Sequence, residues 1–291
     1  MHTSKSKLMS KSADELKSLT TQIRRDILRM VHAVNSGHPG GSLGCVEYFT
    51  ALYGKVMNYK FPFSMEAKGE DVFYLSNGHI SPVFYSTLAR FGFFPVEELS
   101  TFRKLNSRLQ GHPTTHEHLE GVRMSSGSLG QGLSVGIGTA LAKKLDGDTS
   151  LVYTLHGDGE QQEGQIWEGL MFAAAKKVDN LIATIDYNGQ QIDGSTEHVL
   201  SLGNLHAKLE AFGWEVLEEK NGNDLEAVIA VLEHAKSKTG NGKPIAIILH
   251  TEMGNGVDFM MGTHAWHGKA PNNDQLDSAL NQLYIETVSD Y

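Results

Sequence analysis

An oxygen-rich loop that follows an apolar segment is the part of this chain best suited to chemistry. Residues 156–168 read HGDGEQQEGQIWE and follow the segment LVYTL, which is typical of a buried strand. Asp158 lies between two glycines, and glycine allows the backbone to approach a ligand closely. Asn188 follows the next apolar segment, NLIATIDY (180–187). Two side chains with oxygen ligands therefore come directly after two consecutive predicted strands.

These two side chains favour a metal-bound diphosphate. Neighbouring strands of a parallel sheet lie about 5 Å apart, so Asp158 and Asn188 could hold one cation between them. Mg²⁺ prefers one or two carboxylates, neutral oxygens and phosphate oxygens. A helix beginning after Gly159 would direct free N–H groups at the same point, but it supplies only about half a positive charge. Because a diphosphate carries several negative charges, we expect a divalent cation held by Asp158 to balance the rest.

Two other phosphate-binding motifs fit less well. The dinucleotide fingerprint Gly-x-Gly-x-x-Gly is broken at its third glycine, where the chain has Gln162. Asp186 could serve as the ribose-binding acid of that motif, but Asn188 would then have no role. A P-loop requires Gly-Lys-Ser/Thr, and the Gly-Lys pairs that begin at 242 and 268 continue with proline and alanine.

Histidine and glycine occur together in five segments of a chain that has 14 histidines and 31 glycines. One such segment is more often an ordinary surface loop, but five of them favour loops that surround a ligand. The segments are SGHPGGSLG (36–44), SNGHIS (76–81), QGHPT (110–114), HGDG (156–159) and WHGKAP (266–271).

Alternating helix-like and strand-like segments must position these loops. Ser12 and Glu15 form a capping-box pattern, and Ser81 followed by Pro82 predicts an N-cap with proline in the first turn. Helical spacing of apolar residues and near-continuous apolar runs predict the other elements. The expected helices cover 12–35, 46–56, 81–92, 125–145, 164–177, 205–213 and 224–238, and the expected strands cover 71–75, 150–156, 180–187, 214–219 and 244–251.

This order of elements predicts an α/β fold with a doubly wound, mostly parallel sheet and helices on both faces. Ligands of such sheets bind at the carboxyl ends of strands. We expect residues 1–11 to form a flexible tail and 12–291 a single domain. Four glycines would each weaken an isolated helix over 125–145 by ~1 kcal/mol relative to alanine, so we expect this helix to approach another part of the molecule closely. These are Gly130, Gly132, Gly136 and Gly138.

The composition argues against several classes of protein. The formal net charge of −9 repels nucleic acid and anionic lipid, so we expect neither as a partner. No segment reaches the roughly 18 apolar residues of a membrane span, and the basic N-terminus lacks the apolar run of a secretory signal. The single cysteine, Cys45, cannot form an internal disulfide. We expect a cytoplasmic location.

The motifs and their order resemble those of transketolases. Gly-Asp-Gly at 157–159, followed by Asn188, resembles the thiamine diphosphate motif. The segments SGHPGGSLG, SNGHISP, GHP, GSLGQGLSVGIG and WHGKAP occur in transketolase order over residues 36–271. The resemblance implies the thiamine diphosphate-binding fold of the PP (diphosphate-binding) type, with thiamine diphosphate and Mg²⁺ as cofactors. It also implies the transfer of a two-carbon glycolaldehyde (ketol) unit from a ketose phosphate to an aldose.

Site residues carry over from the family motifs by position. The metal ligands implied in this way are Asp158, Asn188 and the backbone carbonyl of Gln190. The implied cofactor contacts are His79 and His267 with the diphosphate, the N–H group of Gly159, Gly127, Ser128 and Leu129 with the aminopyrimidine, Ile192 with the thiazolium, and Glu163 in an activation network between paired active sites. The catalytic candidates are His38, His79, His112 and His267; for His112, a role in orienting the substrate alone is an equal alternative.

The chain departs from the family pattern in three ways. Ser128 stands where many transketolases have proline, and Glu160 where many have cysteine. The chain also ends at Tyr291, whereas a full transketolase continues into a pyrimidine-binding domain and a C-terminal domain. The resemblance therefore implies the N-terminal subunit of a split transketolase. We expect it to be active only with a partner subunit that supplies both domains and the activating glutamate, in a dimer of heterodimers (a heterotetramer).

Several alternatives remain compatible with these residues. Sugar phosphates of the pentose phosphate pathway are the first expectation, but a split transketolase for a branched-sugar phosphate or a sulfonated ketose fits every residue. A different thiamine diphosphate enzyme would be a deoxyxylulose-phosphate synthase or the α chain of a 2-oxo-acid dehydrogenase. A non-catalytic scaffold subunit is disfavoured, because it has no use for Asp158, Asn188 and Gln190 together.

Overall fold

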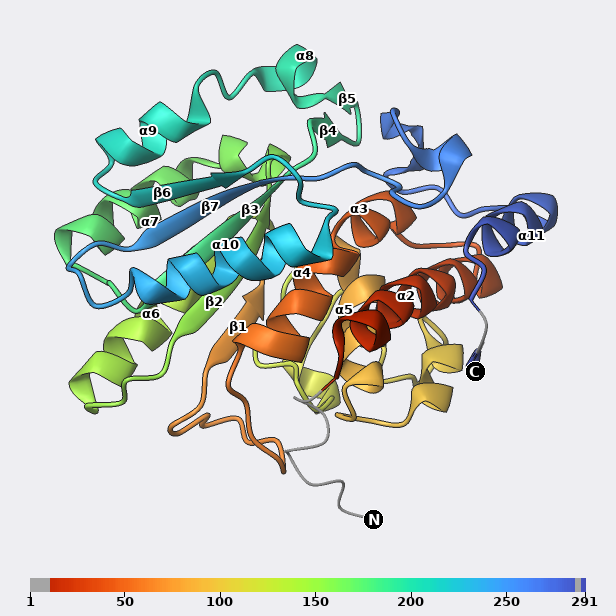
Figure 1. Ribbon diagram of the computed structural model, residues 1–291, viewed down its shortest axis with the longest axis horizontal. Coiled ribbons are helices and arrows are strands. Elements are labelled where there is room, and N and C mark those ends of the chain that lie inside the picture. The colour runs from red at the N-terminus through yellow and green to blue at the C-terminus, as the bar shows by residue number, and fades with distance from the viewer. Residues whose placement is uncertain (1–10, 286–288) are drawn as a thin grey trace.

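A five-stranded parallel sheet forms the centre of the computed structural model, which describes residues 11–285 and 289–291 (Figure 1). The strand order is β1-β2-β3-β7-β6, and every neighbouring pair is parallel. The predicted α/β fold is therefore confirmed, while the predicted tail falls, apart from Lys11, outside the described residues. The strands are β1 (Val72–Leu75), β2 (Val152–Gly157), β3 (Leu181–Tyr187), β6 (Glu215–Glu219) and β7 (Ile245–His250).

Helices cover both faces of this sheet, as the sequence predicts. Side chains of a strand point alternately to its two faces, so Phe73 and Leu75 pack in one core while Val72 and Tyr74 pack in the other. This double burial explains why the strands read as near-continuous apolar runs. One layer contains α2 (Ala13–Ala33), α4 (Val46–Ala51), α5 (Ser81–Arg90) and α10 (Leu225–Ser237), and the other contains α6 (Gln131–Leu145), α7 (Gly164–Ala175) and α9 (Leu205–Ala211).

Within the described part of the chain, no helix combines the length and the apolar character needed to cross a membrane.

The remaining elements are mostly short. The short elements are the helices α3 (Pro39–Gly44), α8 (Thr196–Leu200) and α11 (Asn273–Gln282), the hairpin strands β4 (Gln190–Gln191) and β5 (Gly194–Ser195), a π-helix at Leu52–Val56, and 3₁₀ segments at Gly78–Ile80, Val96–Thr101, Thr115–Glu117, Gly159–Gln162, Asp258–Met260 and His264–Trp266.

Of the two predicted helix caps, one is confirmed and one is wrong. At α2, Ser12 N–H donates to Glu15 Oε2 at 2.6 Å, and Glu15 N–H donates to Ser12 Oγ at 3.2 Å, which completes the capping box. Ser81 is not an N-cap, because it is already the first residue of α5. Its hydroxyl instead donates to the carbonyl of Gly111 at 2.8 Å, so a long-range contact replaces the expected local one.

Several helix boundaries also differ from those expected. The segment 36–44, expected as a loop, contains α3, because its glycines allow close packing: a Cβ at Gly40 would lie 2.8 Å from the carbonyl oxygen of Trp266. The helix expected from residue 125 begins at Gln131. The helix expected over 164–177 does begin at Gly164, but the residues directly after Gly159 form a 3₁₀ turn, Gly159–Gln162, and not the helix N-terminus expected there.

The expected close approach of α6 is confirmed at two of its glycines. A Cβ at Gly132 would lie 2.4 Å from the Cβ of Ser76, and one at Gly136 would lie 2.6 Å from Cγ2 of Thr154. Both distances are too short for any side chain, so α6 packs directly on Ser76, which follows β1, and on the middle of β2. The same expectation is wrong for Gly138, where a Cβ would meet nothing within 4 Å.

Candidate active site

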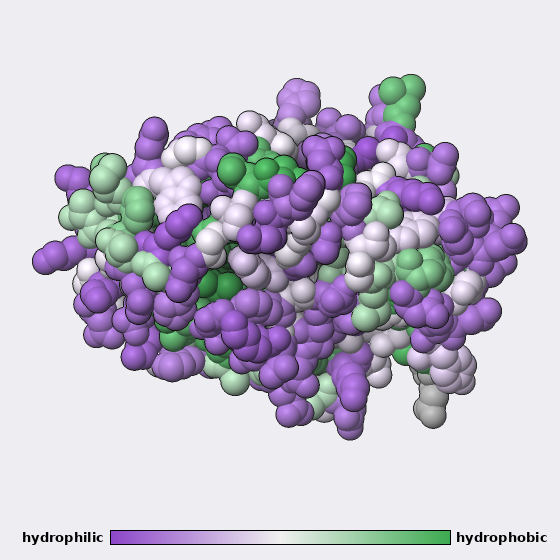
Figure 2. All heavy atoms as spheres, turned by 90° about the horizontal axis from the view of Figure 1, so that it is seen from above, coloured by the Kyte–Doolittle hydropathy of each residue, from purple (hydrophilic) through white to green (hydrophobic). Residues whose placement is uncertain are grey.

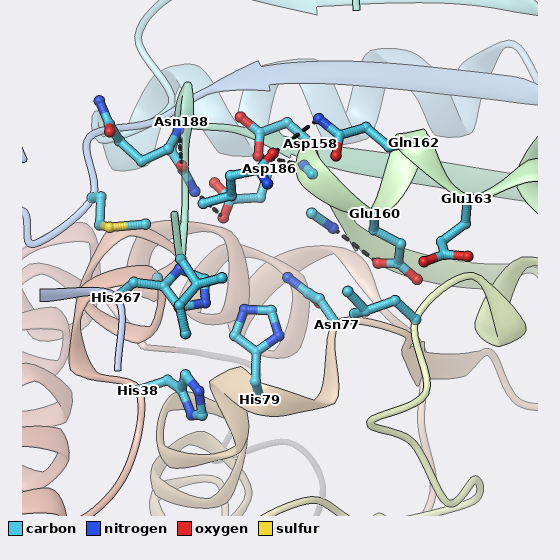
Figure 3. A pocket seen from close by; sticks show the side chains of 18 of the residues that line it. His38, Asn77, His79, Asp158, Glu160, Gln162, Glu163, Asp186, Asn188 and His267 are labelled. Carbon is cyan, nitrogen blue, oxygen red and sulfur yellow. Dashed lines mark hydrogen bonds between the residues drawn. The ribbon is translucent and has the colours of Figure 1, made fainter. Parts of the chain in front are cut away.

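A cavity of about 380 Å³ lies at the carboxyl ends of the central strands (Figure 3). Because β2 and β3 are neighbours, the residues that follow them meet at this edge of the sheet. The loop after β1 and the segment before α6 complete the wall. Predicted site residues that line the cavity are His38, His79, Gly127, Leu129, Asp158, Gly159, Glu163, Asn188, Gln190, Ile192 and His267.

Two predicted site residues do not line this cavity. Ser128 is exposed and lies between the lining residues Gly127 and Leu129. His112 is also exposed, with its ring centroid 6.3 Å from that of His38. A Cβ at Gly127 would lie 2.8 Å from Cδ2 of His112, so His112 packs behind the backbone of Gly127.

The carboxylate of Asp158 connects the ends of the two central strands. It is buried, its Oδ1 accepts a hydrogen bond from Gly159 N–H at 2.7 Å, and its Oδ2 accepts one from Gly189 N–H at 2.6 Å. Asn188 Oδ1 accepts a hydrogen bond from Gln190 N–H at 2.9 Å. The oxygen atoms predicted to hold a cation therefore come from one compact arrangement of backbone and side chains.

Asp186 is a site residue that is absent from the predicted set, because the sequence suggests it only as a possible ribose-binding acid of the dinucleotide motif that does not fit. Its buried Oδ2 accepts a hydrogen bond from Asn188 Nδ2 at 2.9 Å, and its other oxygen accepts one from the Thr251 hydroxyl. Asp186 thereby fixes the orientation of the Asn188 amide. The alternation of side chains along a strand could have identified it, since residues two positions apart face the same side.

The charge of the cavity decides which anion it could accept. Four carboxylates line it, from Asp158, Glu160, Glu163 and Asp186, and none of the described lining residues is lysine or arginine. Burial, followed by the charge of Asp186, raises the pKa of Asp158 to about 7. A diphosphate could enter such an acidic site only together with a cation.

The donor set of this cavity fits magnesium. Among the described residues, no group of three or more His, Cys, Asp and Glu side chains is placed to hold a metal ion. A cation here would therefore depend on one carboxylate, the Asn188 amide and backbone carbonyls. Mg²⁺ accepts this combination, because it commonly uses few protein ligands and completes its shell with water and phosphate oxygens.

Three histidines face one another across the lower part of the cavity (Figure 3). The ring centroid of His38 lies 5.2 Å from that of His79 and 5.5 Å from that of His267, and the latter two rings stack at 5.1 Å. Burial lowers the pKa of His38 to about 4 and also lowers the pKa values of His79 and His267. All three imidazoles are therefore neutral near pH 7.

Several buried polar atoms around the cavity have no partner among the described residues. They are His38 Nδ1, Asn77 Oδ1, Ser126 Oγ and His267 Nδ1. Buried polar atoms are normally hydrogen-bonded, and a group left without a partner calls for a ligand or water. Three of their residues, His38, Asn77 and His267, line the same cavity as the carboxylates, which supports a polar ligand bound there.

The rim of the cavity exposes apolar side chains. Viewed from the side of α8 and the β4–β5 hairpin, the surface shows hydrophobic patches among mostly hydrophilic residues (Figure 2). Ile192, Val199 and Leu200 belong to this part of the chain and are 61%, 40% and 58% exposed. Of these, Ile192 also lines the cavity.

Comparison with known proteins identifies close relatives. Residues 16–289 match the family described as transketolase, thiamine diphosphate binding domain. The chain is 39% identical to an apulose-4-phosphate transketolase subunit of Phocaeicola vulgatus, over 89% of this chain and 90% of the relative. It is 37% identical to the 6-deoxy-6-sulfo-D-fructose transketolase subunit SqwG of a Clostridium species, over 96% and 99% of the two chains.

Solved structures of longer proteins share the same fold. Transketolase from Pichia stipitis in complex with sedoheptulose-7-phosphate superposes with a TM-score of 0.85 at 34% identity, over 94% of this chain and 41% of that one. Transketolase from Leishmania mexicana superposes with a TM-score of 0.87 at 29% identity, over 95% and 42%. The chain thus spans about two fifths of the length of these proteins.

Proposed function

The chain belongs to the transketolase family, in which it forms the thiamine diphosphate-binding domain, and we propose that it is the N-terminal subunit of a two-subunit transketolase. As a member of this family it is part of a thiamine diphosphate-dependent transferase. The proposed activity is the transfer of a two-carbon ketol unit from a ketose phosphate to an aldose. Relatives named as single subunits match it over nearly their whole length, which supports the split arrangement.

The observation that carries this proposal is the acidic cavity at the ends of β2 and β3. A cavity without lysine or arginine among its described lining residues needs a cation before it can hold a diphosphate. We propose that Asp158, the side chain of Asn188 and the carbonyl of Gln190 hold Mg²⁺. The N–H group of Gly159 would donate to the diphosphate once the carboxylate of Asp158 turns to the metal.

The other predicted residues would hold the rest of the cofactor. In this proposal His79 and His267 contact the diphosphate, and Gly127, Ser128 and Leu129 contact the aminopyrimidine. Ile192, exposed at the rim, would cover the thiazolium, and Glu163 would connect paired active sites. When bound, thiamine diphosphate supplies the nucleophile that breaks and forms the carbon–carbon bonds.

The histidines are proposed to act on the substrate itself. Neutral imidazole offers one donor and one acceptor nitrogen, so His38 and His267 can take a proton from a sugar hydroxyl and return it. Both residues line the cavity, which supports this role. His112 is exposed and does not line the cavity, which favours orienting the substrate over proton transfer.

The substrate and the partner follow from the relatives as proposals. We propose a partner subunit that supplies the pyrimidine-binding and C-terminal domains, in a dimer of heterodimers. The single-subunit relatives are named for apulose 4-phosphate and a sulfonated fructose, which favours a branched or sulfonated ketose over a pentose phosphate. These relatives are transketolases and lend no support to a deoxyxylulose-phosphate synthase or a 2-oxo-acid dehydrogenase. A pentose phosphate pathway role and a cytoplasmic location remain predictions.

Reconstitution with the partner subunit tests the proposal. The chain alone should bind thiamine diphosphate and Mg²⁺ weakly or not at all and should show no turnover. Co-purified with the partner and supplied with thiamine diphosphate, Mg²⁺ and an acceptor aldose, it should release a carbonyl product two carbons shorter from one member of a panel of pentose, branched and sulfonated ketose substrates, detected by mass spectrometry. Turnover by the isolated chain would refute the split arrangement, and no transfer from any ketose by the assembly would refute the activity.

A further inference from the structure

Glu160 is a buried carboxylate that none of the roles proposed above uses. Its side chain is 2% exposed, although the residue contributes to the lining of the cavity. A charged group is retained in a protein interior only where hydrogen bonds replace its contacts with water. The partners of its two oxygen atoms therefore indicate what it does.

Those partners come from three different segments of the chain. Oε1 of Glu160 accepts hydrogen bonds from the Ser76 hydroxyl and from Gly130 N–H, the latter at 2.7 Å. Oε2 accepts one from Gly157 N–H at 3.0 Å. Ser76 directly follows β1, Gly130 precedes α6, and Gly157 ends β2. One carboxylate thus connects three segments that are separate in the sequence.

The network continues from Ser76 to the first turn of α6. The Ser76 hydroxyl accepts a hydrogen bond from Gly132 N–H at 3.0 Å, and a Cβ at Gly132 would lie 2.4 Å from the Cβ of Ser76, so the two residues pack directly on each other. Each connected segment also carries a residue of the cavity wall. Asn77 follows Ser76, Leu129 precedes Gly130, and Asp158 follows Gly157. Glu160 is therefore hydrogen-bonded to each of the three segments that carry these wall residues.

We propose that Glu160 is a positioning residue that joins the three segments into one rigid wall before the cofactor binds. The identity of the ligand, thiamine diphosphate, rests on the proposed function. A preformed wall removes the cost of ordering these loops during binding. A cysteine here could not replace the clamp, because a thiol is shorter than a carboxylate and accepts hydrogen bonds only weakly.

Glu160→Gln is the most informative variant, because it keeps size and removes one acceptor. All three partners are donors, so the amide NH₂ must face at least one of them. Glu70→Gln is the matched control. Glu70 is equally buried at 2%, and it accepts from Arg123 and from Lys60 N–H at the opposite end of β1, away from the cavity.

Two measurements test the clamp. Hydrogen–deuterium exchange of the cofactor-free chain should show residues 126–134 exchanging about tenfold faster in Glu160→Gln than in wild type. Calorimetry on the chain assembled with its partner subunit, with Mg²⁺ present, should show thiamine diphosphate binding about tenfold more weakly. Glu70→Gln should lower the melting temperature without either effect.

The outcomes separate the clamp from a general loss of stability. Faster exchange spread evenly over the chain, or unchanged cofactor affinity, would overturn the proposal. If Glu160→Gln does not fold, Ser76→Ala removes one hydrogen bond of the same network. This variant should also show faster hydrogen exchange confined to residues 126–134, with a smaller increase. Unchanged exchange of these residues in Ser76→Ala would overturn the proposal too. If the wild-type assembly binds no cofactor, the proposed function fails, while the exchange data still decide whether Glu160 clamps the wall.

Discussion

The carboxylate of Asp158 accepts a 2.6 Å hydrogen bond from the backbone N–H of Gly189, so the end of β2 is tied to the loop that follows β3. This tie holds Asp158 beside the segment that carries Asn188 and Gln190. Glycine suits position 189 because its φ of +73° lies in the left-handed region. A single backbone contact thus brings together the three proposed metal ligands.

Asp158→Asn should abolish Mg²⁺-dependent cofactor binding in the assembled enzyme. The variant keeps the size of the side chain but removes the only charge among the proposed ligands, so affinity should fall by on the order of 100-fold or more. Titration calorimetry with thiamine diphosphate and Mg²⁺ measures this. Asp148→Asn, which lies before β2 and pairs with Lys143, should leave the affinity unchanged. Equal affinity in Asp158→Asn and wild type would exclude a metal role.

Asp186→Asn should weaken metal binding without removing a proposed ligand. Its carboxylate accepts from both Asn188 Nδ2 and the Thr251 hydroxyl, and an amide cannot accept equally well from both. A loss of about 10- to 100-fold in metal affinity is typical when such an orienting partner is changed. Titration of Mn²⁺ in place of Mg²⁺, followed by electron paramagnetic resonance, measures it. Thr251→Val should show a smaller loss in the same direction, and an unaffected titration in both variants would contradict the orienting role.

His267→Asn should reduce turnover more than it reduces stability. A well-placed proton donor or acceptor contributes about 10²- to 10⁴-fold to rate, whereas this residue is only partly buried. Steady-state kinetics of the assembled enzyme should therefore show at least about a 100-fold lower kcat. The melting temperature should fall no more than in His32→Asn, a control at the end of α2 whose ring contacts Asn273. A normal kcat would restrict His267 to a structural role.

His38→Asn should make the folded chain less sensitive to acid. Burial, with the nearby His267 and Arg103, lowers the pKa of His38 to about 4 from a usual 6.5. Between these values the unfolded chain binds a proton that the folded chain does not, so His38 lowers the free energy of unfolding as the pH falls through this window. The drop in melting temperature between pH 7.5 and pH 5 should be smaller in the variant than in wild type. His116→Asn, at an exposed position, is the control. The same drop in melting temperature in His38→Asn and in wild type would contradict the reasoning.

The sequence allowed most of the sheet and part of the site to be predicted. The apolar runs of β2 and β3 are local patterns, and side chains that follow consecutive parallel strands meet at one edge of the sheet. Asp158 and Asn188 could therefore be placed together without a structure. The family motifs added the remaining proposed site residues, and the cavity collects all of them except Ser128 and His112.

Contacts between distant segments could not be predicted in this way. The hydrogen bond between Ser76 and Glu160 joins residues 84 positions apart, and that between Ser81 and Gly111 joins residues 30 apart. Because the sequence does not show the first contact, Glu160 appears there only as a departure from the family pattern. Because of the second contact, Ser81, expected to be an N-cap, makes a tertiary hydrogen bond instead. The glycines of α3 likewise read as a loop, although Gly40 packs against Trp266.

By itself, the sequence determined the periodicity of the strands and helices, the acidic Gly-Asp-Gly turn and the family. The periodicity and the turn depend on residues within one element, where the chain's own geometry limits the outcomes, and the family depends on the order of motifs along the chain. Only the tertiary structure decided that β1 lies beside β2, that α6 packs on Ser76, and that Glu160 connects three loops. Such neighbours depend on how separate layers pack, because burial of apolar faces brings together residues whose spacing along the chain carries no information about their distance.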